Sequence, residues 1–168
     1  MKAYQLLQAI SPALRQEIIS YVQTETREAF RTALYQMAAQ RKLRPQFMQK
    51  KTREQQAAWM LENLRLKSFD GVAEQLFQLW LLKAKTQLLA TFLDAAGIKH
   101  DGKGQVDDLP EELTAKQVSD GIDAMLKENS GEQAAVYLNL FQGQRPGGWP
   151  AVAEALEKRE ELKLEVKV

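Results

Sequence analysis

The sequence predicts an all-α fold, and three observations support that prediction. Apolar residues recur at steps of three and four along most of the chain, which is the spacing of an amphipathic helix. Helix start and stop signals are frequent, whereas the alternating pattern of a strand is confined to residues 162–168. The stretch from Leu76 to Ile98 begins apolar on nearly every side, so other helices must surround it. We therefore expect an irregular bundle of about six helices around a central buried helix over about residues 69–96.

The chain length suits a single domain. A chain of 168 residues is long enough to bury a core without help from disulfides or a metal. We expect one domain over residues 1–168, with a long helical hairpin over 11–66 and a helical core over 69–160. Residues 162–168 form a tail that is either flexible or strand-like, because a lone strand has no sheet to join.

The first arm of the hairpin has a clear start. Ser11 supplies an N-cap and Pro12 occupies the first helical position, where its missing N–H costs nothing. The apolar stripe then continues to about Gln40. It is interrupted by the polar residues 23–26, and this gap predicts either a bend or a stretch that other helices cover little.

Arg44 marks a boundary, because the residue before a proline avoids the helical region, and the second arm should begin between Pro45 and Thr52. Thr52 and Gln55 have the spacing of a capping box, and the helix should run to about Leu66.

Punctuation of the same kind divides the rest of the chain. Gly97 stands where a left-handed residue commonly ends a helix, and Thr114 with Gln117 forms a second capping box. Residues 129–131 break the pattern again, and Pro150 opens the last helix.

Composition excludes several classes of function. The net charge is only +1, so the chain as a whole has no strong positive electrostatic field that would attract nucleic acid. The chain has no cysteine and therefore no thiolate nucleophile. Lys83 and Lys85 interrupt the most apolar stretch, which argues against a membrane span. The N-terminus lacks the apolar region of a secretory signal, so we expect a cytoplasmic protein with no membrane partner.

The only histidine, His100, lies in a glycine-rich loop and is the first candidate for chemistry. Its sole neighbouring partner is Asp101, and no serine elbow accompanies it, so we favour an exposed or loop-capping role. The run from Asp101 to Glu112 resembles a calcium loop at its ends only, since Lys103 and Val106 replace required residue types. We predict no catalytic residue, metal or cofactor.

A cluster of cations, the basic corner, is the strongest local asymmetry. No acid lies between its first and last members, and one aromatic residue lies among them. Such a patch suits phosphate groups, with the aromatic ring stacking on a base. The favoured alternative is a solvated corner between helices whose charges pair with the acidic residues of 107–112. The basic corner consists of Arg41, Lys42, Arg44, Phe47, Lys50, Lys51 and Arg53.

Trp149 lies between two glycines and a proline, and either packs in the core or anchors a partner at the surface. We retain His100 and Trp149 as candidate surface anchors. An apolar pocket between helices with carboxylates such as Asp94 at its mouth would instead indicate a small-ligand binder or an enzyme.

The leading hypothesis for function is a non-catalytic cytoplasmic module that interacts with or regulates a protein. Its partner is another protein or a second copy of the chain, and its candidate surfaces are the basic corner, the glycine-rich loops with Trp149, and the alternating tail. The alternatives are nucleic-acid binding through the basic corner at residues 41–53, and the interhelical pocket just described.

Overall fold

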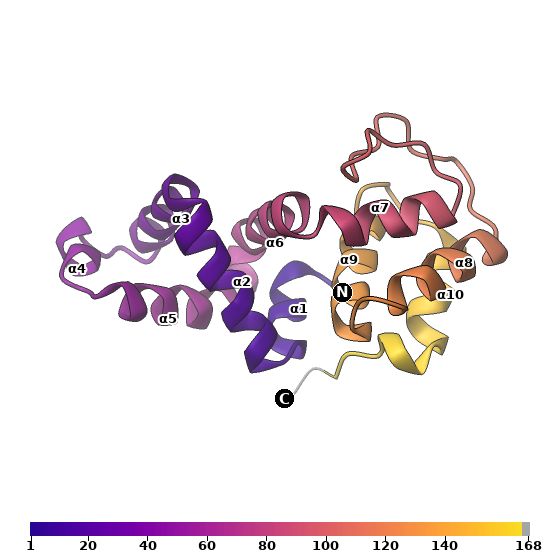
Figure 1. Cartoon of the computed structure of the whole chain (residues 1–168). Helices are drawn as coiled ribbons and strands as arrows, with labels where there is room; N and C mark the ends of the chain where they lie inside the picture. Colours follow the sequence, from indigo (N-terminus) through magenta and orange to yellow (C-terminus); the bar gives the residue numbers. More distant parts are fainter. Residues whose placement is uncertain (166–168) are drawn as a thin grey trace. The chain divides into compact units, whose positions relative to one another are not determined.

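The computed structural model describes residues 1–165, and it is helical (Figure 1). Within these residues there are ten α-helices, two 3₁₀ helices and no strand, so the prediction of an all-α fold is confirmed. The helices are more numerous and shorter than the six expected, because both of the longest predicted helices are divided and two short helices, Ala3–Ala9 and Pro45–Gln49, add to the count.

Contacts along the chain gather into two compact units, residues 1–80 and residues 81–165. The prediction of one domain over residues 1–168 stays a prediction.

The first unit contains the predicted hairpin. Its helices and the start of α6 are α1 (Ala3–Ala9), α2 (Pro12–Glu25), α3 (Arg27–Gln40), α4 (Pro45–Gln49), α5 (Arg53–Leu64), the 3₁₀ helix η1 (Lys67–Phe69) and α6 (Asp70–Ala84). Helix α2 packs on α3 and α5, and α3 packs on α4 and α5. The core of this unit includes the fully buried side chains Leu6, Ile19, Leu34, Met37, Met48, Met60, Phe69, Phe77 and Trp80.

The predicted start signals and the bend of the hairpin are confirmed. The Ser11 hydroxyl accepts a hydrogen bond from the Leu14 N–H at 3.1 Å, and Thr52 forms the capping box with Gln55. The bend is a full break at Thr26, whose φ of −125° and ψ of 56° leave the helical region. The Thr26 hydroxyl donates to the Val22 carbonyl at 2.7 Å and so satisfies its own buried polar atom.

The prediction of a continuous central helix over residues 69–96 is wrong. Lys85 has φ of −121° and ψ of 31°, and it separates α6 from α7 (Thr86–Ala95). No residue from 82 to 87 is buried, so tertiary packing does not hold the helical conformation there. Leu82 is exposed, so this end of α6 is not enclosed on all sides as its apolar character suggested.

The second unit follows the predicted punctuation. It comprises α7, α8 (Ala115–Leu126), α9 (Gly131–Gln142), α10 (Pro150–Lys158) and the 3₁₀ helix η2 (Glu160–Leu162). Helix α7 packs chiefly on α8, while α10 contacts both α8 and α9. The Thr114–Gln117 capping box begins α8 as predicted, and Gly97, with φ of 71°, follows the end of α7.

Aromatic side chains form the centre of this unit. The Phe92 ring meets the rings of Tyr137 and Phe141 edge-on, with 5.5 Å between centroids in each pair. The ring of Phe141 stacks on Trp149 at 4.5 Å. Burial raises the pKa of Tyr137, since the charged phenolate would lose its hydration. A buried aromatic core therefore ties α7, α9 and the start of α10 together.

The tail prediction is only partly covered by the described residues. Leu162 is buried at the end of η2, and residues 163–165 have no regular secondary structure. Residues 166–168, the remainder of the predicted strand-like tail, lie outside the described residues.

Candidate binding site: an arginine-lined pocket

The basic corner occupies the end of α3, the short helix α4 and the start of α5. Its residues are exposed, except for Lys51, which is half-buried. Among residues 1–80, none of its six cationic side chains forms an ion pair. The predicted pairing with the acidic residues of 107–112 stays a prediction. Within its own unit, the basic corner is therefore a surface of uncompensated positive charge.

Phe47 projects from α4 with 44% of its surface exposed. The ammonium group of Lys51 lies over its ring, 4.6 Å from the centroid, which is a cation–π contact. One face of the ring is thus already covered by a cation, which weakens the interpretation of Phe47 as a stacking platform for bases.

Lys42 has an unusual backbone conformation. Its φ of 58° is the only positive φ of a residue other than glycine in residues 1–165. Two hydrogen bonds close the end of α3, from the Lys42 N–H to Ala39 O and from the Leu43 N–H to Ala38 O, each 2.9 Å long. This is a Schellman motif with lysine at the position that glycine usually takes. The left-handed conformation costs a side-chain-bearing residue about 1–2 kcal/mol.

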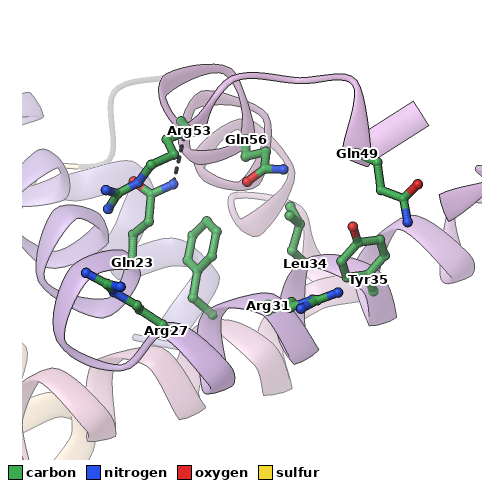
Figure 2. A pocket seen from close by; sticks show the side chains of 9 residues that line it. Gln23, Arg27, Arg31, Leu34, Tyr35, Gln49, Arg53 and Gln56 are labelled. Atoms are coloured by element: carbon green, nitrogen blue, oxygen red, sulfur yellow. Dashed lines mark hydrogen bonds between the residues drawn. The ribbon is translucent and has the colours of Figure 1, made fainter. Parts of the chain in front are cut away.

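Beside the basic corner lies a pocket of about 440 Å³, which we call the arginine pocket (Figure 2). Its floor is apolar and its rim carries three guanidinium groups and three amides. Figure 2 shows Arg53 and Gln56 facing Arg27 and Arg31 across the space between them. The lining residues are Gln23, Arg27, Phe30, Arg31, Leu34, Tyr35, Gln49, Arg53 and Gln56.

Helical periodicity explains the face that α3 turns to the pocket. Arg27, Arg31 and Tyr35 are four residues apart and lie on one side of the helix. The guanidinium carbon of Arg31 is 5.8 Å from the centroid of the Tyr35 ring, so the ring helps to hold this side chain. Phe30 and Leu34, also four residues apart, are buried and supply the apolar floor.

Side-chain amides join the helices around the pocket. Gln23 of α2 donates to the Arg53 carbonyl at 2.8 Å, and Gln56 of α5 donates to the Met48 carbonyl at 3.0 Å. These bonds connect α2 with α5 and α5 with α4. These bonds help to hold the helices around the pocket together, and such preorganisation reduces the entropy lost on binding.

The electrostatic character of the pocket is positive. No carboxylate is among its lining residues, and Arg53 occupies the first turn of α5, where the helix dipole adds positive potential. Residues 1–80 contain twelve Lys and Arg against seven Asp and Glu, a formal charge of +5. Residues 81–165 contain ten against fifteen, a formal charge of −5. The near-neutral whole chain conceals this division.

A second depression, of about 730 Å³, lies between α2 and α5 and shares Gln23 and Arg53 with the arginine pocket. Glu54 and Glu62 are among its lining residues, so its charge is mixed. It is a weaker candidate for an anionic ligand than the arginine pocket.

His100 occupies a loop-capping position. Its side chain is 7% exposed, its Nε2 lies 2.6 Å from Asp94 Oδ1, and its Nδ1 accepts the Gly102 N–H at 3.0 Å. Because Nδ1 is an acceptor, the ring proton of the neutral form is on Nε2 and points at Asp94. Both ring nitrogens are thus engaged in holding the loop, and neither is free to act as a base or a ligand.

The candidate calcium loop is organised by a different use of its first carboxylate. Asp101 Oδ1 accepts the N–H groups of Lys103 and Gln105 at 2.8 and 3.1 Å. These bonds hold the pKa of the Asp101 carboxyl below its usual value. Asp94, expected at the mouth of a pocket, instead pairs with His100 and does not line the arginine pocket.

The prediction of Trp149 as a surface anchor is wrong, because its side chain is fully buried. Its indole N–H donates to the Pro110 carbonyl at 2.9 Å, while the Gln142 side chain bonds both its backbone N–H and its carbonyl. The turn residues around Trp149 fold it inward against Phe141. The alternative of core packing describes this residue.

Sequence reasoning found Arg53 but missed the rest of the pocket. The available signal was the spacing of Arg27, Arg31 and Tyr35 on one face of the predicted first arm. That face differs from the buried stripe, and it gains meaning only when α4 and α5 stand opposite.

No helix within residues 1–165 has the length and apolar character needed to cross a bilayer. No protein-family model, curated protein or solved structure matches the chain.

Proposed function

We propose that this chain is a non-catalytic cytoplasmic interaction module that binds an acidic, partly apolar segment of a protein in the arginine pocket. The observation that carries the proposal is the combination of Arg27, Arg31 and Arg53 around an apolar floor with no lining carboxylate. Guanidinium groups donate several hydrogen bonds in a fixed plane and pair well with carboxylates. The floor of Phe30 and Leu34 favours an apolar side chain beside those carboxylates.

Binding rather than catalysis suits the residues present. The arginine pocket contains no histidine, carboxylate or cysteine to act as a general base or nucleophile, and arginine stays protonated. Glutamine and tyrosine side chains on the rim supply hydrogen bonds that orient a ligand without reacting with it.

A direct test uses a fluorescein-labelled peptide, Glu-Glu-Leu-Phe-Glu-Glu, and the same peptide with every Glu replaced by Gln. Fluorescence anisotropy should show binding of the acidic peptide that weakens as salt is raised, because salt screens exposed charges. The Gln peptide should bind at least about tenfold more weakly, which corresponds to about 1.4 kcal/mol.

The variant Arg27→Glu/Arg53→Glu should reduce acidic-peptide binding by about tenfold or more. Its matched control is Lys2→Glu/Lys67→Glu, which makes the same change in charge at exposed residues of the same unit, away from the pocket. Equal loss in both variants would reveal a net-charge effect and refute a site at the pocket. Equal binding of the acidic and Gln peptides would refute the role of the arginines.

Nucleic-acid binding is the second candidate, and the observation that favours it is that the cations of the basic corner form no ion pair within residues 1–80. The test is a gel-shift assay with a single-stranded oligonucleotide. If this function is present, Lys50→Glu/Arg44→Glu should abolish a salt-sensitive shift, because two cations that contact phosphates are replaced by carboxylates that repel them. A shift unchanged in this variant would exclude the basic corner.

A further inference from the structure

The chain itself contains a segment with the chemistry that the arginine pocket favours. Residues 107–112 read Asp-Asp-Leu-Pro-Glu-Glu, so two carboxylates stand on each side of an apolar pair. We call them the acidic segment. The side chains of Asp107, Asp108, Glu111 and Glu112 are all exposed, and Leu109 and Pro110 are half-buried.

The acidic segment is held in place by its backbone. The Pro110 carbonyl accepts the Trp149 indole N–H at 2.9 Å, and the Glu111 carbonyl accepts a guanidinium N–H of Arg145. Since Trp149 is fully buried, this contact fastens the segment to the aromatic core of its unit. The backbone is thus fixed while the four carboxylates point away from it into solvent.

None of these four carboxylates forms an ion pair with another residue of 81–165. This is notable because residues elsewhere in the same unit do pair, as Lys116 does with Asp120 and Arg159 does with Asp123. The acidic segment and the arginine pocket are therefore oppositely charged surfaces, each unneutralised within its own unit.

We infer that the partner bound in the arginine pocket is the acidic segment of a second copy of this chain, so that copies associate pocket to segment. This inference rests on the proposed function. Charge complementarity carries it: three arginines around an apolar floor face four carboxylates flanking Leu109 and Pro110, in units of formal charge +5 and −5. Such a contact joins two different surfaces, so it produces either a closed pair with two contacts or a head-to-tail series.

The decisive experiment measures solution mass by light scattering for the full chain and for two charge-reversed variants. The pocket variant is Arg27→Glu/Arg53→Glu, and the segment variant is Asp107→Lys/Glu112→Lys. The wild-type mass should rise above 19.1 kDa with protein concentration and fall back at high salt. Each variant alone should remain monomeric, because like charges then face one another.

An equimolar mixture of the two variants should associate again. The pocket variant supplies an intact acidic segment and the segment variant an intact pocket, so at least one complementary contact forms between them. The matched controls Lys2→Glu/Lys67→Glu and Glu128→Lys/Glu157→Lys change exposed charges elsewhere and should leave the wild-type mass unchanged. Circular dichroism of each variant checks that its helices are intact.

Three results would overturn the inference. A wild-type chain that stays monomeric at all concentrations and low salt has no such contact between copies. If the charge-reversed variants assemble as the wild-type chain does, the copies associate through other surfaces. Separate variants that are monomeric but do not associate when mixed lack the complementarity that the inference requires.

The proposed function can fail separately. Binding of Glu-Glu-Leu-Phe-Glu-Glu in the pocket by a chain that never self-associates would sustain the proposed function and overturn the inference. Absence of peptide binding together with absence of association would overturn both. Association without peptide binding, if the pocket variant still assembles, would move the contact to another face and overturn both as well.

Discussion

Lys42 gives a sharp test because its backbone conformation and its charge can be changed independently. Glycine adopts a φ of 58° at no steric cost, so Lys42→Gly removes the backbone strain. Lys42→Ala removes the charge and keeps the strained conformation. Relief of the left-handed penalty is worth about 1–2 kcal/mol. The greater entropy that glycine loses on folding offsets about half of this, so Lys42→Gly should stabilise by about 0.5–1 kcal/mol.

The same chain contains the inverse case. Gly97 follows α7 with φ of 71° and the same two bonds, from its N–H to Asp94 O at 3.1 Å and from Ile98 N–H to Leu93 O at 2.8 Å. A Cβ at Gly97 would meet nothing within 4 Å, so Gly97→Ala isolates the conformational term. It should destabilise by about 1 kcal/mol.

The assay is guanidinium unfolding of each variant, with amide hydrogen exchange to report residues 1–80 and 81–165 separately. Lys42→Gly should raise the free energy of opening in the first unit, Gly97→Ala should lower it in the second, and Lys42→Ala should change neither by more than about 0.5 kcal/mol. The reasoning is refuted if Lys42→Gly and Lys42→Ala have equal stability, because backbone strain then contributes nothing.

Three further changes test other parts of the structure. Gly121→Ala should destabilise by about 1–3 kcal/mol in thermal unfolding, since its Cβ would lie 2.6 Å from the buried Phe92 ring; Gly71→Ala, with no atom within 4 Å, should be neutral or stabilising. His100→Ala removes both bonds of the loop cap and should cost about 1–2 kcal/mol, with faster hydrogen exchange confined to the loop and no loss of peptide binding. The pKa of Asp101, measured by NMR in the folded protein, should be below that of the same residue in an unfolded peptide. Because the folded pKa is lowered, any stability lost in Asp101→Ala should be seen at pH values above the unfolded pKa. This loss should vanish as the pH falls through the folded pKa. Global unfolding in His100→Ala, or an unshifted Asp101, would contradict these explanations.

Local chemistry explains which helix boundaries the sequence predicted correctly. The caps at Ser11, Thr52 and Thr114 each depend on a side chain and a backbone N–H three residues away, so the necessary information lies within one turn. The end of α7 at Gly97 depends on one residue that tolerates positive φ.

Helix interruption is harder to predict because it depends on packing. The break at Thr26 followed a visible gap in the apolar stripe, but Lys85 has neither proline nor glycine beside it. Residues 82–87 continue the helical spacing in the sequence, although none of them is buried. Local periodicity therefore predicted one helix where the tertiary structure supports two.

For Trp149 the sequence leaves two alternatives open, core packing and a surface anchor, and only the structure decides between them. Neighbouring glycines and prolines indicate a surface turn, and the turn is present. The side chain nevertheless stacks on Phe141 and donates to Pro110, which lies 39 residues earlier. A turn fixes the direction of the backbone, while distant partners decide whether a large side chain at that turn is buried.

The basic corner and the arginine pocket both carry positive charge that no carboxylate within residues 1–80 neutralises through an ion pair. Like charges left unpaired within one unit repel each other and reduce its stability. A lysine in the left-handed region adds a further local cost, which a glycine would remove. Folding alone gives no reason for residues 41–53 to combine both costs, because the same helices would pack on the same buried residues without them. Energetically unfavourable features that occur together are typical of binding surfaces, where a ligand compensates for them. A ligand with several carboxylates would neutralise the arginines as it binds, so the charge that destabilises the free unit would stabilise the complex.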